Sequence, residues 1–328
     1  PETFNSTKRG RAVRKIAAVA SFGMAILALA GNGMAADGVA FTADQAYPEG
    51  IAYSAKDKTF IVSSLRHGVI ARVSASGDYQ PFITDEKLIS TVGVLWDRKR
   101  NLLWVANSDP GLSTRSSDAT RNKLAAVAVY DASTGAQRAY HDLGGLVDGG
   151  HFANDLAQDD KGNVYVTDSF APVIYRIDTA GKRSVFARSD LFRGEGFNLN
   201  GIVVHPGGYL LVAKYNTGDL FRVSLKHPDK IESIALKSPL KGADGLILDS
   251  ANRLFVVQNQ GADALVELVS SDGWRSATEV SRRKTAMSFP TTGTRVARSV
   301  YVLNARLDSL IDANAPKAKE FLLQKFDR

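Results

Sequence analysis

Four oxygen-bearing side chains recur at one register along the chain and could together bind a metal ion. Each stands eleven residues before a short apolar triplet: Glu49, Asn154, Asn200 and Asp244. If the fold brings them to one point, two carboxylates and two amides would repel one another and lack partners unless a dication offsets them. Calcium accepts about 6–8 oxygen ligands, so four side chains with water or substrate would complete its shell. Zinc fits less well because no His or Cys joins the set.

The same residues have a simpler interpretation as the starts of turns, since Asn-Gly and Asp-Gly are common hairpin signals. The shared register favours one metal site over four separate turns. The equivalent positions of two further repeats are Gly93 and Pro290, which cannot bind an ion through their side chains. The pattern therefore predicts four side-chain ligands.

Six apolar triplets define the repeat that must position these ligands. They are Phe60-Ile61-Val62, Trp104-Val105-Ala106, Tyr165-Val166-Thr167, Leu211-Val212-Ala213, Phe255-Val256-Val257 and Tyr301-Val302-Leu303. Four of the five intervals between them are 44 or 46 residues, and the remaining one is 61. A period near 45 with β-branched and aromatic enrichment indicates one four-stranded sheet per repeat. Six such sheets predict an all-β, six-bladed β-propeller, in which the first strand of each blade lines the central axis.

The long interval contains a polar insertion, residues 107–123, that is rich in Ser, Asp and Arg and lacks strand periodicity. A loop longer than about 12–15 residues in a compact domain is either functional or disordered. We expect a mobile flap that contributes to substrate preference. The alternative is a disordered loop without a role in function. Nearer the ends, residues 38–41 are expected to form a strand that closes the ring on the last blade. Residues 317–326 are expected to form a terminal strand or a short helix.

Residues 1–35 have the pattern of a signal peptide, followed by a single propeller domain over residues 36–328. Basic residues from Lys8 to Lys15 precede fifteen apolar residues, 16–30. That stretch is shorter than the roughly 20 residues needed to span a bilayer, although an uncleaved anchor is the alternative. A small-x-small pattern predicts cleavage after Ala35, with Ala30 as the second choice. We therefore expect a periplasmic or secreted protein with no stable membrane anchor.

Charge and cysteine content exclude several classes of function. The chain has 41 Lys and Arg against 34 Asp and Glu, but five of the basic residues lie in the first fifteen. Without those fifteen residues the excess falls to three, which disfavours a nucleic-acid partner. The absence of cysteine excludes disulfides, thiolate metal sites and a cysteine nucleophile.

The motifs around the four candidate ligands resemble those of the senescence-marker-protein/gluconolactonase/luciferin-regenerating-enzyme family. They are Tyr47-Pro48-Glu49-Gly50, Ala153-Asn154-Asp155, Asn200-Gly201 and Ala243-Asp244-Gly245, within a resemblance that covers about residues 45–305. The resemblance implies a six-bladed propeller, a calcium ion at the axis, and hydrolysis of lactones or phosphotriesters. It also implies that Glu49, Asn154, Asn200 and Asp244 are the ligands and that Asp244 is the base or nucleophile. The chain departs from the family in its second-blade insertion and in having no histidine in the sixth blade.

Two further residues are weaker candidates for contacts with substrate. Asn107 occupies the blade in which the resemblance places substrate contacts. The alternative interpretation is that Asn107 only marks the end of a strand. His151 lies three residues before Asn154, so it could shuttle protons, or it could be a loop histidine bonded to backbone. The sequence has neither a phosphate-binding loop nor a Gly-x-Ser-x-Gly elbow.

The sequence thus predicts an exported, calcium-dependent hydrolase of lactones or related esters, of the gluconolactonase kind. The alternatives are a non-catalytic propeller that binds a ligand or partner around a structural calcium, an arylesterase or phosphotriesterase, and a metal-free lyase of the strictosidine synthase kind. We expect a small-molecule substrate, no nucleic-acid partner and a monomer.

Overall fold

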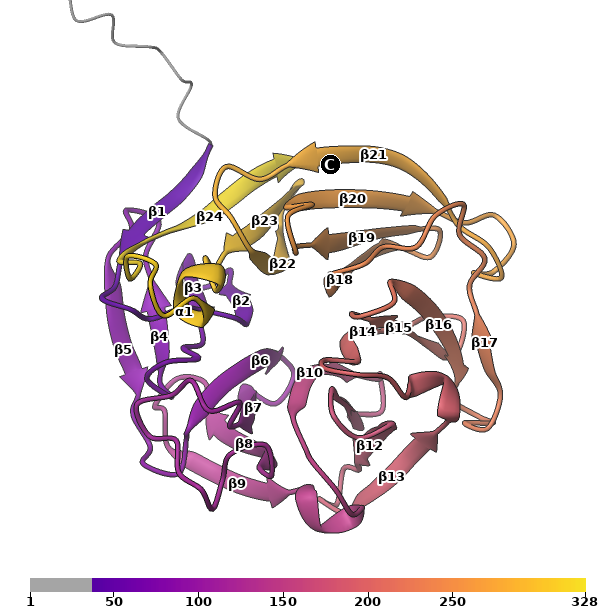
Figure 1. Cartoon of the computed structure of the whole chain (residues 1–328), viewed down its shortest axis with the longest axis horizontal. Helices are drawn as coiled ribbons and strands as arrows, with labels where there is room; N and C mark the ends of the chain where they lie inside the picture. The colour runs from indigo at the N-terminus through magenta and orange to yellow at the C-terminus, as the bar shows by residue number, and fades with distance from the viewer. Residues whose placement is uncertain (1–36) are drawn as a thin grey trace, which may run out of the picture. The chain divides into compact units, whose positions relative to one another are not determined.

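Residues 37–328 form six four-stranded antiparallel sheets arranged around a central axis, as Figure 1 shows for the computed structural model. The structure describes residues 37–328, and the predicted signal peptide lies outside them. The sheets confirm the expected all-β six-bladed propeller. None of the helices in the described range is long and apolar enough to cross a membrane.

Each blade is a meander of consecutive strands, except the sixth. The first three blades contain β2 (Ile51–Ser54), β3 (Thr59–Val62), β4 (Ile70–Val73) and β5 (Tyr79–Ile83); β6 (Ser90–Asp97), β7 (Leu102–Ser108), β8 (Ala125–Asp131) and β9 (Gln137–Asp142); and β10 (Ala153–Gln158), β11 (Val164–Asp168), β12 (Val173–Ile177) and β13 (Arg183–Arg188). The fourth and fifth contain β14 (Leu199–His205), β15 (Tyr209–Lys214), β16 (Asp219–Ser224) and β17 (Ile231–Ser233); and β18 (Ala243–Ser250), β19 (Arg253–Gln258), β20 (Ala264–Val269) and β21 (Thr278–Lys284).

The sixth blade combines strands from both ends of the described chain. It contains β22 (Pro290–Val296), β23 (Ser299–Asn304), β24 (Glu320–Asp327) and β1 (Gly38–Thr42), which pairs antiparallel to β24 as the outermost strand. The expected closing strand is therefore confirmed, and the segment at 317–326 is mainly strand. A four-residue helix, α1 (Asp308–Ile311), lies between β23 and β24.

Apolar second and third strands hold neighbouring blades together. The six triplets lie on β3, β7, β11, β15, β19 and β23, the second strand of every blade. These strands are buried on both faces, so they appear in the sequence as continuous apolar runs rather than alternating ones. Leu211 on β15 and Val256 on β19, for example, belong to one cluster of buried side chains between the fourth and fifth blades.

The first strands lie around the axis (Figure 1), and each contacts the first strand of the neighbouring blade. A Cβ atom at Gly50 would collide with the carbonyl oxygen of Val92 in the next blade, and one at Gly201 with that of Asp244. The glycines that follow Glu49, Asn200 and Asp244 are therefore required by close approach of strands. The Asn-Gly and Asp-Gly pairs lie within β14 and β18, so their interpretation as hairpin turns is wrong.

Pairing between the first and second strands corrects two of the six equivalent positions. Asn154, Asn200 and Asp244 each follow the last paired residue before a bulge near the start of their strand, and in the second and sixth blades this place belongs to Val92 and Thr291. Gly93 and Pro290 were each misplaced by one residue. The reason is that the first hairpin is one residue longer in the second blade and one shorter in the sixth.

The predicted insertion begins later than expected and is anchored. Asn107 and Ser108 still belong to β7, so the loop to β8 starts at Asp109. The Arg115 guanidinium donates to the carbonyl oxygens of Asp85 at 3.0 Å and Leu88 at 2.7 Å. The buried Asp109 carboxylate accepts from the hydroxyls of Ser116 and Thr120, each at 2.6 Å. The Arg115 bonds tie the loop to the chain before β6 and the Asp109 bonds connect its own residues, so the loop is anchored, in contrast to the expected mobile flap.

Candidate functional site

The four predicted ligands lie together at the base of one cavity on the axis. Glu49, Asn154, Asn200 and Asp244 all line this cavity of about 320 Å³, and all four side chains are buried. They come from the first, third, fourth and fifth blades, whose first strands contact one another around the axis. The two remaining equivalent positions, Val92 and Thr291, do not line the cavity, and the Thr291 hydroxyl donates to the backbone oxygen of Glu49 at 2.9 Å.

The side chain of Asn154 presents a free oxygen to this site. Its Nδ2 donates to the Ser169 hydroxyl at 2.9 Å, and that hydroxyl donates to the carbonyl oxygen of Leu199 at 2.6 Å. Because the Ser169 proton is already used, the hydroxyl can only accept from Asn154, which fixes the amide orientation. The buried Oδ1 of Asn154 is then left without a hydrogen-bond partner. A buried polar atom of this kind is costly unless something binds it.

Asp244 is held by a chain of hydrogen bonds from the neighbouring strands. Asn259 Nδ2 donates to Asp244 Oδ2 at 2.8 Å and to the carbonyl oxygen of Pro290 at 3.1 Å. The Tyr215 hydroxyl donates to Asn259 Oδ1 at 2.7 Å, which orients that amide in turn. Asp244 therefore has a fixed position in the base of the cavity.

The electrostatics of the base favour a cation. Burial raises the pKa of Glu49 well above its ordinary value, and the nearby charges of Asp244 and Asp155 raise it further. Burial also raises the pKa of Asp244, although the hydrogen bond from Asn259 opposes the shift. None of the residues that line the cavity in the described part of the chain is Lys, Arg or His. Like charges without a protein counter-ion are stabilised by a bound cation.

Sequence reasoning missed a third carboxylate beneath this base. Asp155 lines a small void below the four ligands, and burial raises its pKa to about 6. Asp155 stands at the position that Gly50, Gly201 and Gly245 occupy in other blades. Gly93 of the second blade lies against Asp155 of the third in the same way that Gly201 of the fourth blade lies against Gly245 of the fifth. A carboxylate at a position where four of the other five repeats have glycine was the signal that could have found it.

The donor set fits calcium, which prefers carboxylate and amide oxygens. Two carboxyl groups and two amides, one with an unpartnered oxygen, match that preference. No cluster of three or more His, Asp or Glu side chains forms a metal site by itself within residues 37–328. The candidate site therefore depends on the amide oxygens of Asn154 and Asn200.

Asn107 lies outside the cavity, and its polar atoms are used elsewhere. Its Oδ1 accepts from the Ile89 N–H at 2.8 Å, while Nδ2 donates to the carbonyl oxygen of Lys87 at 2.8 Å and to Tyr140 at 3.2 Å. Asn107 thus fixes the chain that enters β6. The structure gives no support to its expected role as a substrate contact.

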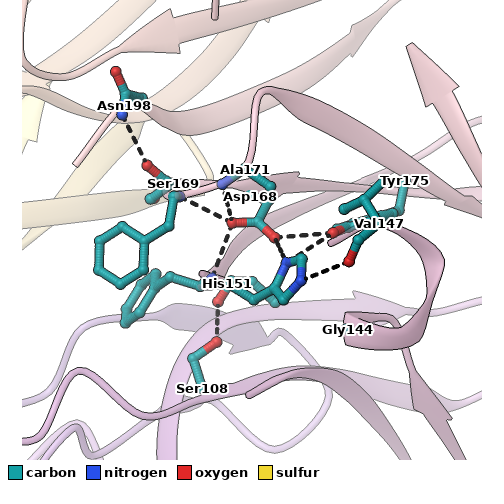
Figure 2. A network of polar contacts seen from close by, with 12 residues as sticks. Ser108, Gly144, Val147, His151, Asp168, Ser169, Ala171, Tyr175 and Asn198 are labelled. Carbon is teal, nitrogen blue, oxygen red and sulfur yellow. Dashed lines mark hydrogen bonds and ion pairs between the residues drawn. The ribbon is translucent and has the colours of Figure 1, made fainter. Parts of the chain in front are cut away.

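His151 is also removed from the cavity and is part of the buried network in Figure 2. Its Nδ1 lies 3.0 Å from Asp168 Oδ2, and its Nε2 lies 3.0 Å from the carbonyl oxygen of Val147. Both partners are acceptors, so both ring nitrogens are satisfied only when the imidazole is protonated. The hydrogen bond to Asp168 raises the pKa of His151 accordingly. The alternative interpretation, a loop histidine bonded to backbone, is closer to the structure than a proton shuttle.

This geometry predicts that His151 stabilises the fold more at low pH than at high pH. A histidine whose pKa is raised by folding contributes fully below its unfolded value of about 6.5, and the contribution is lost as pH rises through the folded pKa. We expect His151→Gln to lower the free energy of unfolding by a larger amount at pH 5.5 than at pH 8.5. Urea unfolding of both proteins at the two pH values measures the difference. An equal loss at both values would mean that His151 is neutral in the folded protein.

No family profile matches the sequence, and no curated protein is significantly similar to it. Its structure is similar to that of the major Malassezia sympodialis allergen Mala s 1, with a TM-score of 0.69, 15% identity, and coverage of 88% of this chain and 96% of that one. A protein assigned as a gluconolactonase gives a TM-score of 0.60 and 15% identity, and the match covers 90% of this chain and 94% of that one.

A luciferin-regenerating enzyme gives a TM-score of 0.61 and 12% identity, covering 88% of this chain and 95% of its own. The neighbours therefore include enzymes, and identities this low establish the fold alone. The predicted resemblance is confirmed at that level: the chain is a six-bladed propeller similar in structure to a protein assigned as a gluconolactonase and to luciferin-regenerating enzyme.

Proposed function

We propose that the protein is a calcium-dependent hydrolase of lactones or related esters. The observation that carries this proposal is the base of the axial cavity, where buried carboxyl and amide groups meet without a cationic side chain and Asn154 Oδ1 has no partner. Glu49, Asn154, Asn200 and Asp244 would hold the ion. Bound calcium would supply Lewis-acid polarisation of a carbonyl group and would offset the charge that develops on its oxygen.

The protein's own groups support the hydrolytic step. The Asp244 carboxylate would accept a proton from water as the water oxygen adds to the carbonyl carbon, and would return it to the alkoxide oxygen that leaves as the acyl carbon–oxygen bond breaks. Asn259 and Tyr215 keep that carboxylate oriented. In the competing version, which suits phosphotriesters, Asp244 attacks the substrate directly.

Turnover assays test this proposal. The panel contains γ- and δ-lactones, aryl esters and phosphotriesters, each with added calcium and with EDTA. Hydrolysis that requires calcium supports the proposal. Stabilisation by calcium without turnover of any member would favour the second candidate, a non-catalytic propeller that binds a ligand around a structural ion. With either function, export by the predicted leader would place the protein in the periplasm or outside the cell.

Calcium is expected to raise the melting temperature. A ligand that binds only the folded protein stabilises it by RT ln(1 + [L]/Kd), which is about 2.7 kcal/mol at one hundred times Kd. Asp244→Asn removes one of the two charges among the ligands, so its stabilisation by calcium should be much smaller. Asp160→Asn, a change at an exposed turn, is the matched control and should respond like wild type. Thermal unfolding over a calcium titration measures the shift. Unchanged calcium affinity in Asp244→Asn would remove Asp244 from the site.

A further inference from the structure

Above its polar base, the axial cavity is apolar. Ten of the fifteen residues that line it are aliphatic, aromatic or proline, and four of the other five form the base. The remaining polar residue is Asn122, from the loop between β7 and β8. Most of the surface that a ligand would contact is therefore hydrocarbon.

Three phenylalanines form one wall of this cavity and pack against one another. The ring centroids of Phe152 and Phe170 lie 5.5 Å apart, and Phe197 lies 5.2 Å from the first and 4.9 Å from the second. The backbone N–H groups of Phe152 and Phe170 both donate to Asp168 Oδ1 at 2.9 Å, as Figure 2 shows in part. The wall is therefore built on a fixed backbone, which preorganises it for a ligand.

Large apolar side chains at the rim of the same cavity are exposed to solvent. Ile311 on α1 is 60% exposed and Phe197 is 36% exposed. They are two of the four large exposed hydrophobic residues in the described part of the chain. Apolar groups kept in water beside a cavity are typical of a binding site for an apolar ligand.

The walls have few groups that could bind hydroxyls. The Tyr215 hydroxyl already donates its proton to Asn259, so among the lining side chains above the base only Asn122 still has a donor. A sugar lactone would bury several hydroxyl groups without partners, and each unpaired polar group costs about 1–3 kcal/mol. An anionic substrate would find no Lys, Arg or His among the lining residues, and the two carboxylates at the base already balance the charge of a bound calcium ion.

We propose that the substrates are neutral lactones or esters with an apolar substituent, an alkyl chain or an aromatic ring, that lies against the phenylalanine wall. Polyhydroxylated sugar lactones are excluded. This inference rests on the proposed hydrolase function for the reacting group. The binding of the apolar substituent depends on the walls alone.

A homologous series tests the inference by turnover. kcat/KM is measured for γ-butyrolactone, γ-hexalactone and γ-nonalactone, with D-glucono-1,5-lactone as the polar comparison. Each methylene that becomes buried should raise kcat/KM about three- to fourfold until the cavity is filled. A flat series, or preferred turnover of the sugar lactone, would overturn the inference.

Variants at the rim show whether the wall causes the preference. Phe197→Ser and Ile311→Ser should each lower kcat/KM for γ-nonalactone by a larger factor than kcat/KM for γ-butyrolactone, and Phe197→Leu should restore most of the ratio between the two. Val280→Ser is the matched control, because Val280 is 53% exposed on β21 and does not line the cavity. Loss of the advantage in the control, or its persistence in both rim variants, would contradict the assignment.

Binding of γ-nonalactone, measured by calorimetry, separates this inference from the proposed function. If no lactone is hydrolysed but γ-nonalactone binds and Phe197→Ser weakens its binding, the hydrolase proposal fails and the apolar site stands. If γ-nonalactone neither binds nor is hydrolysed, the apolar site fails too.

Discussion

An Asp244→Asn variant is expected to lose about a thousandfold of kcat/KM on the substrate that wild type hydrolyses fastest. A positioned base contributes about 10²–10⁴-fold to a rate, and Asp244 is also one of the two carboxylates among the proposed calcium ligands. The amide can still accept the hydrogen bond from Asn259, so the fold around it should be retained. Without added calcium the melting temperature should therefore remain close to that of wild type.

Steady-state kinetics at saturating calcium, next to Asp160→Asn, measure this effect. Because the variant is also expected to bind calcium more weakly, kcat/KM is compared over a calcium titration that reaches saturation. A variant that retains more than about a tenth of the wild-type kcat/KM would show that Asp244 is not the base.

Replacement of Asp168 by Ala is expected to lower the free energy of unfolding by about 3–5 kcal/mol. Asp168 Oδ1 accepts backbone hydrogen bonds from Phe152, Phe170 and Ala171, each at 2.9 Å. Its Oδ2 accepts from the Tyr175 hydroxyl at 2.9 Å and from His151 at 3.0 Å (Figure 2). The change would leave all five donors buried without their acceptor.

Urea denaturation of the Asp168→Ala protein measures this loss. Asp178→Ala is the matched control, since Asp178 also accepts backbone hydrogen bonds, from Ala180 and Lys182, but in a surface turn. The control should lose only about 1 kcal/mol. Similar losses in both variants would mean that water or a rearranged backbone replaces the carboxylate.

The propeller could be predicted from the sequence because each blade repeats the same buried second strand. The triplets from Phe60 to Leu303 are apolar on both faces, and this requirement is imposed by packing between blades. The candidate ligands could be predicted for the same reason. Asn154, Asn200 and Asp244 stand at a constant distance from their triplets because their hairpins have the same length.

The same reasoning failed where a local length or a distant contact decides the structure. Val92 and Thr291 were missed because their hairpins differ by one residue. The anchoring of the loop by Arg115 depends on backbone oxygens about 30 residues earlier in the chain, which no local pattern reveals. Asn107 bonds to Tyr140, 33 residues later in the same blade, and His151 bonds to Asp168, 17 residues later, so these contacts need the same spatial information.

The composite sixth blade sets the order in which the protein can fold during synthesis. β1 is among the first described residues to leave the ribosome, but its partner β24 is about 280 residues further along the chain. The five preceding blades can form as local meanders while synthesis continues, whereas β1 stays unpaired until β24 emerges. An unpaired strand edge is prone to pairing with other chains. The slowest and most vulnerable stage of folding is therefore expected to be the last one, when the two ends meet and the ring closes.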